Sequence, residues 1–310
     1  MKIDKAKRNL IKFLPLIGLS LGLKPDHLWA ASNANLSLSK IPSSGESIFP
    51  IGMGTWITFN VGNDHFLREQ RTKVLKAFFE LGGQMIDSSP MYASAEQVLG
   101  HCLTNINNDK SLFSATKTWT SSSATAKQQF ENSLRFWRQK QIDLLQVHNL
   151  VSWQNHLAYL QELKQQKLIR YIGVTTSHGR RHAELEKILK SQKLDFVQLT
   201  YNILDRDAEK RLLPLAQEQG VGVIANRPFQ GGSLISRVQR YPLPPWADSL
   251  GIYNWPQYLL RFILSHSAIT CAIPATSQVP HMIENMTAIN DVPLPSIANR
   301  DKMIEYFQSL

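Results

Sequence analysis

Cysteine, metal-ligand clusters and nucleic-acid-binding patterns are scarce in this 310-residue sequence, and each absence excludes a class of function. The 2 cysteines, Cys102 and Cys271, lie far apart and lack the close spacing of zinc or iron–sulfur ligands. We therefore expect no metal site and two free thiols, with Cys271 in a buried strand. The formal net charge is +10, but no segment interleaves Lys and Arg with aromatic residues. A basic solvated surface is expected rather than a nucleic-acid partner.

No apolar run is long enough to span a membrane. The N-terminal run, residues 13–23 (FLPLIGLSLGL), falls well short of the roughly 20 residues required. A basic segment precedes this run and the small residues Ala30 and Ala31 follow it, which is the order of an export signal. Lys7-Arg8 resembles a twin-arginine signal with Lys in the first place.

We therefore expect residues 1–34 to be an export signal, cleaved to give a periplasmic or otherwise exported protein without stable membrane insertion. Residues 35–310 are then expected to form one domain. The alternative is an amphipathic anchor or tail that is not a functional signal, which would leave the protein in the cytoplasm. The sequence leaves the oligomeric state open.

The rest of the chain alternates short apolar runs with longer stretches that are typical of amphipathic helices. Eight strand-plus-helix units predict an α/β fold, a single-domain (β/α)8 TIM barrel, rather than a doubly wound sheet. No G-x-G-x-x-G turn follows any strand, which also argues against the doubly wound alternative. The predicted strands lie near Phe49–Gly54 and at Met85–Ser88, Leu112–Thr118, Ile142–His148, Tyr171–Thr175, Phe196–Tyr201, Val221–Ala225 and Ile269–Pro274. The predicted helices include Arg71–Leu81, Ala126–Trp137, Trp153–Lys167, Arg181–Leu189, Asp207–Gln219 and one near Arg300–Gln308.

Ionisable residues gather at the ends of three neighbouring predicted strands. Asp87, Lys117 and His148 each lie at the tail of an apolar run, and Tyr92 follows on the loop after Asp87. Because the carboxyl ends of barrel strands form one mouth, we expect these four side chains to converge there.

These four residues predict proton transfer to a carbonyl oxygen. A phenol has a pKa near 10, and an ammonium such as Lys117 beside Tyr92 lowers that pKa. Asp87 holds Lys117 charged and in place, while His148 hydrogen-bonds the carbonyl oxygen and orients it. No residue supplies hydride, so a cofactor must. The alternative is a structural network in which Asp87 pairs with Lys117 and Tyr92 packs in a loop.

The segment that carries Asp87 and Tyr92 resembles the signature of the aldo-keto reductase family. This similarity covers GQMIDSSPMY at residues 83–92 and SAEQVLG at residues 94–100. Four further segments resemble the family's opening strand and loop, its catalytic Lys and His segments, and its adenosine-phosphate segment. They are Gly52–Trp56, Ala115–Lys117, Gln146–His148 and Ile273–Asn285.

The resemblance implies an NAD(P)H-dependent oxidoreductase that reduces aldehydes or ketones to alcohols, with Tyr92 as general acid. Asp87, Tyr92, Lys117 and His148 match the family's catalytic tetrad. Residues implied to bind the cofactor, or in the case of Trp56 to lie near the substrate entrance, are Thr175, Thr176, Gln198, Arg227, Thr276, His281, Glu284, Asn285 and Trp56. The implied partner is a small carbonyl compound.

Several positions depart from the family pattern. Thr176 stands where the family has an Asn that bonds the nicotinamide carboxamide, and Asn226 where many members have an aromatic that stacks on the nicotinamide. Arg227 is expected to stack there or to reach the cofactor pyrophosphate, unless it is a solvent-exposed loop residue. Ala275 and His281 replace Lys and Arg of NADP-preferring members. NADP is the expected cofactor, and NAD is the alternative.

The resemblance implies that the loop at residues 231–253 folds over the cofactor. Its proline-rich stretch PLPPW is typical of an irregular lid. A long C-terminal tail is missing, so we expect an open substrate pocket. One alternative function is a dinucleotide-binding sensor or regulatory barrel with little turnover. Another is a hydrolase or lyase on the same barrel. That function would need paired carboxylates or a metal at the strand ends, and Asp87 is the one acidic residue that clearly follows a predicted strand.

Overall fold

The computed structural model describes residues 38–106 and 111–310. The expected export signal at residues 1–34 therefore lies outside the described residues. Within the described part of the chain, none of the helices has the length and apolar character that a membrane span requires.

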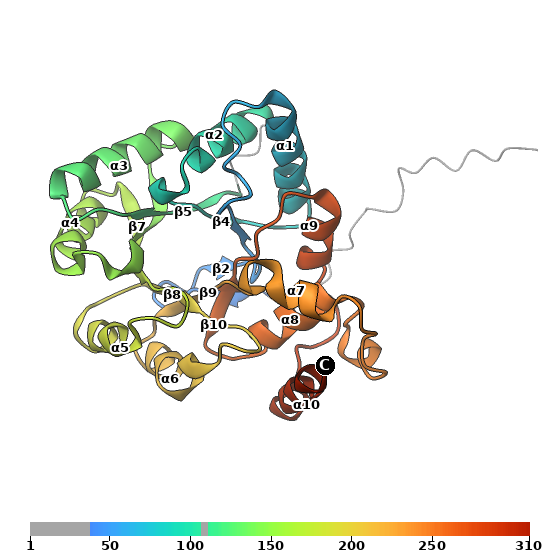
Figure 1. The fold of residues 1–310 in the computed structure, drawn as a ribbon. Helices are drawn as coiled ribbons and strands as arrows, with labels where there is room; N and C mark the ends of the chain where they lie inside the picture. The colour runs from blue at the N-terminus through green and yellow to red at the C-terminus, as the bar shows by residue number, and fades with distance from the viewer. Residues whose placement is uncertain (1–37, 107–110) are drawn as a thin grey trace, which may run out of the picture. The chain divides into compact units, whose positions relative to one another are not determined.

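Eight parallel strands form one sheet in chain order, and the sheet closes on itself (Figure 1). Closure is made by backbone hydrogen bonds from Gly52 N to Ala272 O at 2.9 Å and from Gly54 N to Pro274 O at 3.0 Å. The strands are β3 (Met53–Gly54), β4 (Met85–Asp87), β5 (Phe113–Thr118), β6 (Ile142–Val147), β7 (Ile169–Thr175), β8 (Phe196–Thr200), β9 (Gly222–Asn226) and β10 (Ile269–Ala272). The predicted (β/α)8 barrel is confirmed.

A helix follows each strand, and the helices surround the barrel (Figure 1). They are α1 (His65–Glu80), α2 (Ala95–Ile106), α3 (Ser123–Trp137), α4 (Trp153–Gln165), α5 (His182–Ser191), α6 (Leu212–Glu218), α7 (Ser233–Val238), α8 (Trp255–Leu264), α9 (Val279–Met286) and α10 (Ile297–Ser309). The helix predicted near Arg300–Gln308 is thus α10. The stretch Asp207–Gln219 divides into a 3-10 turn at Asp207–Lys210 and helix α6.

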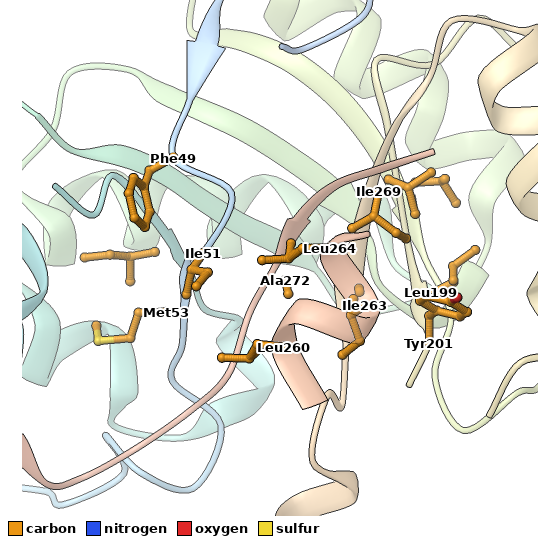
Figure 2. Close-up of a cluster of buried hydrophobic side chains, with 14 of the residues drawn as sticks. Phe49, Ile51, Met53, Leu199, Tyr201, Leu260, Ile263, Leu264, Ile269 and Ala272 are labelled. Atoms are coloured by element: carbon orange, nitrogen blue, oxygen red, sulfur yellow. The ribbon is translucent and has the colours of Figure 1, made fainter. Parts of the chain in front are cut away.

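Apolar side chains fill the space between the strands and the helices. Leu260, Ile263 and Leu264 on α8 lie beside Ala272 on β10 (Figure 2). Leu and Ile side chains buried in this way each contribute roughly 1.5–3 kcal/mol relative to exposure. This layer fixes the strands, and with them the residues at the strand ends.

Aromatic rings fill the barrel interior toward the amino ends of its strands. Phe113 and Tyr171 stack with ring centroids 5.7 Å apart, and Phe196 meets both edge-on. A hairpin of β1 (Ser39–Lys40) and β2 (Ser47–Ile48), which was not predicted, adds buried Ile41 and Ile48 to the same cluster. This packing fills the barrel at the amino ends of the strands, whereas a cavity remains at their carboxyl ends.

Helices α2 and α3 pack very closely. Gly100 on α2 faces the backbone carbonyl of Phe136 on α3, and a Cβ placed on Gly100 would lie 1.7 Å from that oxygen. One turn earlier, the buried carboxylate of Glu96 accepts hydrogen bonds from Thr116 Oγ1 at 2.7 Å and Trp137 Nε1 at 2.9 Å. Glu96 therefore ties α2 to β5 and α3.

The loop at residues 231–253 is more ordered than its proline content predicted. It contains helix α7 and a 3-10 turn at Asp248–Leu250. Leu234 and Val238, one helical turn apart, are both buried against the core. The expectation of an irregular lid is wrong for this part, because these two apolar contacts stabilise a short helix ahead of the prolines.

Candidate active site

A buried ion pair lies at the centre of the strand ends. Lys117 Nζ on β5 is 2.6 Å from Asp87 Oδ1 on β4, and both side chains are almost fully buried. Lys117 also donates to the Ser88 carbonyl at 2.7 Å. The second oxygen of Asp87 accepts from the amides of Gln198 at 2.9 Å and Gln146 at 3.2 Å. Three donors from three strands thus fix the carboxylate.

The ion pair keeps Lys117 charged. Burial by itself lowers the pKa of Lys117, but Asp87, Tyr92 and Glu96 together raise it above the ordinary value. Lys117 Nζ lies 5.4 Å from the centroid of the Tyr92 ring. A positive charge is therefore held beside the phenol.

Burial raises the pKa of Tyr92 above its ordinary value. Lys117 opposes this shift by favouring the phenolate, while Asp87 adds to it. Lys117 thus lowers the pKa of Tyr92 as expected, but desolvation outweighs the ammonium and the net shift is upward. The physical consequence is a phenol that keeps its proton at neutral pH.

His148 faces Tyr92 across the site. Their ring centroids are 6.0 Å apart and nearly perpendicular. Burial, reinforced by the charge of Lys117, lowers the pKa of His148 to about 3. His148 is therefore a neutral imidazole, and its Nδ1 lies 3.0 Å from Ser89 Oγ.

A cavity of about 360 Å³ opens at these strand ends. Three of the four predicted catalytic residues line it, while Lys117 is buried and does not line it. Trp56 is 43% exposed, which places it at the entrance rather than at the base. The predicted site residues that line the cavity are Trp56, Asp87, Tyr92, His148, Thr175, Thr176, Gln198 and Arg227.

The cavity wall has free hydrogen-bonding capacity that suits a polar cofactor. The Thr176 hydroxyl is buried and has no hydrogen-bond partner within the described residues. The Arg227 guanidinium likewise makes no hydrogen bond or ion pair in this part of the chain, although the residue lines the cavity. Because a buried polar group is normally paired, the Thr176 hydroxyl fits a ligand that carries an amide. The half-buried guanidinium of Arg227 suits a phosphate.

Asn226 does not take the place of a stacking aromatic. Its Nδ2 donates to the Thr176 carbonyl at 2.8 Å and its Oδ1 accepts from Thr200 at 2.7 Å. Thr175 Oγ1 accepts from Asn149 N at 3.0 Å and keeps its own proton to donate. Asn226 therefore braces the loop that presents Thr176.

The predicted adenosine-phosphate residues do not line this cavity. Thr276, His281, Glu284 and Asn285 follow β10, on the segment that leads into and forms α9. Thr276 Oγ1 accepts from Gln278 N at 3.1 Å, Asn285 is buried and His281 is exposed. Of the adjoining segment, Ala275 reaches the cavity. The structure thus groups the catalytic and nicotinamide-side residues but not these four.

Sequence reasoning missed three residues that contact the tetrad. Gln146 bonds Asp87, the Ser88 carbonyl bonds Lys117, and Ser89 bonds His148. Gln146 lies on β6 two residues before His148, and the alternation of side chains along the predicted strand was an available signal. Cys102 and Cys271 are free and Cys271 is buried in β10, as predicted, and Cys102 is also buried. No group of His, Cys, Asp and Glu in the described ranges could hold a metal ion.

Comparison with protein families matches residues 50–300 to the Aldo/keto reductase family. The chain belongs to this family. It is 29% identical over 262 residues to the methylglyoxal reductase YeaE of Escherichia coli (strain K12), covering 83% of this chain and 90% of that protein. It is 23% identical over 271 residues to the aldo-keto reductase YhdN of Bacillus subtilis (strain 168), covering 77% and 80%.

Solved structures show the same fold. An aldo/keto reductase from Klebsiella pneumoniae, in complex with NADP and acetate, has a TM-score of 0.73 at 24% identity and covers 87% of this chain and 95% of that one. The holo form of the aldo-keto reductase AKR11C1 from Bacillus halodurans has a TM-score of 0.71 at 23% identity, with coverage of 88% and 96%.

Proposed function

We propose that this protein reduces aldehydes or ketones to alcohols with NADPH, using Tyr92 as the general acid. The observation that carries the proposal is the convergence of Tyr92, the Lys117–Asp87 pair and His148 at one cavity. Membership of the aldo/keto reductase family supports it. Within the described residues no feature of the site favours the sensor alternative, since the Lys117–Asp87 pair lies beside Tyr92 and His148 faces it.

The residues divide the proton chemistry between them. Tyr92 keeps its proton because burial raises its pKa, and it donates this proton to the carbonyl oxygen. Lys117 stabilises the phenolate that remains, and Asp87 holds Lys117 in position. Neutral His148 donates a hydrogen bond to the same carbonyl oxygen and orients it. The bound nicotinamide supplies the hydride.

Three residues that line the cavity would hold the cofactor. Thr176 and Gln198 offer a hydroxyl and an amide oxygen to the carboxamide, and Arg227 offers a guanidinium to a phosphate. NADP is the cofactor bound by the Klebsiella pneumoniae structure. For the 2′-phosphate, the segment from Ala275 to Asn285 supplies the Thr276 hydroxyl and His281. NAD remains the alternative cofactor, because this segment has no Lys or Arg.

The proposed substrates are small aldehydes and ketones, including 2-oxoaldehydes. Similarity to a methylglyoxal reductase supports this class. The rim at Trp56, Ile57 and Met91 is apolar and partly exposed, so it offers contacts to an apolar substituent on the carbonyl.

Fluorescence titration with NADPH and then NADH, followed by a panel of aldehydes, tests this function. We expect tight NADPH binding and consumption of NADPH in a 1:1 ratio with alcohol product. Tight binding without measurable turnover of any aldehyde or ketone would contradict the proposed reaction and support the sensor alternative. Failure to bind either dinucleotide would contradict both.

We also propose that residues 1–34 export the protein, by the twin-arginine route, to the periplasm. The support is the order of basic segment, apolar run and small residues in the sequence. A protein carried across the membrane already folded could acquire its dinucleotide in the cytoplasm.

A further inference from the structure

We propose that Ser89 is a positioning residue that fixes which nitrogen of His148 carries the proton, so that Nε2–H is presented to the substrate. This inference rests on the proposed carbonyl reduction for its kinetic consequence. The tautomer itself is a property of the free protein.

The hydrogen-bond partners of Ser89 determine the direction of the contact. Ser89 Oγ accepts from the backbone N–H of Met91 at 3.2 Å and lies 3.0 Å from His148 Nδ1. No other acceptor for the Ser89 hydroxyl proton occurs within residues 38–106 and 111–310. If Nδ1 carried a proton, the Ser89 hydroxyl would be left without an acceptor. The hydroxyl is satisfied when it donates to an unprotonated Nδ1.

Burial strengthens the preference for the tautomer of His148 that leaves Nδ1 unprotonated. Ser89 is fully buried and His148 is 6% exposed, so bulk water does not replace a missing partner. A buried polar group without a partner is strongly unfavourable, whereas the arrangement with Nδ1 as acceptor pairs both Nδ1 and the Ser89 hydroxyl. His148 is neutral because burial and Lys117 lower its pKa to about 3, so it has one proton, which lies on Nε2.

Ser89 also anchors the turn that carries Tyr92. Ser89 caps the 3-10 turn Pro90–Tyr92 through the Met91 contact, and its carbonyl accepts from Tyr92 N at 2.9 Å. Ser89 thus contacts both residues proposed to bond the carbonyl oxygen. It caps the turn that carries Tyr92, and it bonds the ring of His148.

Nitrogen NMR of protein labelled with ¹⁵N-histidine measures the tautomer directly. The chain has 9 histidines, and the signals missing from a His148→Phe variant identify those of His148. We expect the wild type to show a pyridine-type Nδ1 and a pyrrole-type Nε2. A pyrrole-type Nδ1 in the wild type would overturn the proposal. This result does not depend on turnover, so it is independent of the proposed function.

Substitutions test the kinetic role. Ser89→Ala should lower kcat about 3- to 10-fold, the value of one hydrogen bond, with NADPH affinity unchanged and with exchange between the two tautomers in the NMR spectrum. Ser89→Thr keeps the hydroxyl on extended backbone and should restore both kcat and the tautomer. Ser94→Ala, which removes a hydroxyl from the following loop away from the cavity, is the matched control and should leave both unchanged. A Ser89→Ala protein with wild-type tautomer and kcat would contradict the proposal.

Discussion

The contact between Lys117 and Asp87 removes two charges from water, and its stability depends on all of the partners being present. Asp87 receives one ammonium and two amide donors, and Lys117 receives a carboxylate and a carbonyl. A buried pair of this kind contributes little against an apolar replacement, but removal of one partner leaves an uncompensated charge.

Lys117→Met should therefore lower the free energy of unfolding by about 3–5 kcal/mol. The double variant Asp87→Asn with Lys117→Met should recover a large part of this loss, without recovering activity. Urea unfolding measures both. Lys73→Met, which breaks the exposed pair with Glu69, is the control and should cost less than about 1 kcal/mol. Equal stability of the Lys117→Met protein and the wild type would contradict the assigned burial.

His148 should make stability depend on pH. Its folded-state pKa of about 3 lies below the ordinary value of 6.5, so the unfolded chain binds more protons between these values. The stability contributed by neutral His148 is complete above about pH 6.5 and is lost as the pH falls toward 3. The contribution to the slope is about 1.4 kcal/mol per pH unit.

Urea unfolding between pH 5 and 7.5 measures this slope. His148→Gln should show a shallower dependence than the wild type, whereas His65→Gln, at an exposed position, should follow the wild type. The same slope in all three proteins would show that His148 is not held neutral.

At the scale of elements, Gly100 allows α2 to pack closely on α3, and Glu96 connects α2 to β5 and α3. Gly100→Ala would improve the helix propensity of α2 by about 1 kcal/mol, but its Cβ would lie 1.7 Å from the Phe136 carbonyl oxygen. The overlap should dominate and lower the free energy of unfolding by about 1–3 kcal/mol or more. Gln97→Ala on the exposed face of α2 should be nearly neutral. Stabilisation by Gly100→Ala, measured by thermal unfolding, would contradict the close helix contact.

The strand ends could be predicted from the sequence, whereas the contacts between neighbouring strands could not. Asp87, Lys117 and His148 follow apolar runs, and parallel strands bring their carboxyl ends together whatever the exact register. The pairing of Gln146 with Lys117 across β5 and β6 depends on register, which one sequence does not specify. The Ser89 contact depends on a 3-10 turn, and α7 depends on Leu234 and Val238 packing against distant residues. The burial of Tyr92, which sets the direction of its pKa shift, could likewise not be predicted from the sequence.

At the scale of the whole molecule, aromatic rings and the β1–β2 hairpin fill one end of the barrel, and the cavity opens at the other. The rim of this cavity carries exposed Trp56 and Ile57. We therefore expect a permissive substrate entrance. Turnover of bulky and small aldehydes should differ by less than about a thousandfold, roughly 4 kcal/mol of transition-state binding. A larger difference in kcat/KM across an aldehyde panel would contradict the open pocket.

Export predicts a change at the N-terminus of the protein recovered from its host. Mass spectrometry should find a mature N-terminus near Ala31 to Leu36, in the periplasmic fraction. An intact Met1 in the cytoplasmic fraction would show that residues 1–34 are not a functional signal.

The central claim is that Tyr92 donates the proton in a reduction that consumes NADPH, and Tyr92→Phe tests it most directly. This variant removes one hydroxyl while keeping the ring that packs beside His148. Fluorescence titration should show unchanged NADPH binding, and NADPH consumption with an aldehyde should fall by at least about a hundredfold. Wild-type turnover by the Tyr92→Phe protein would contradict the mechanism.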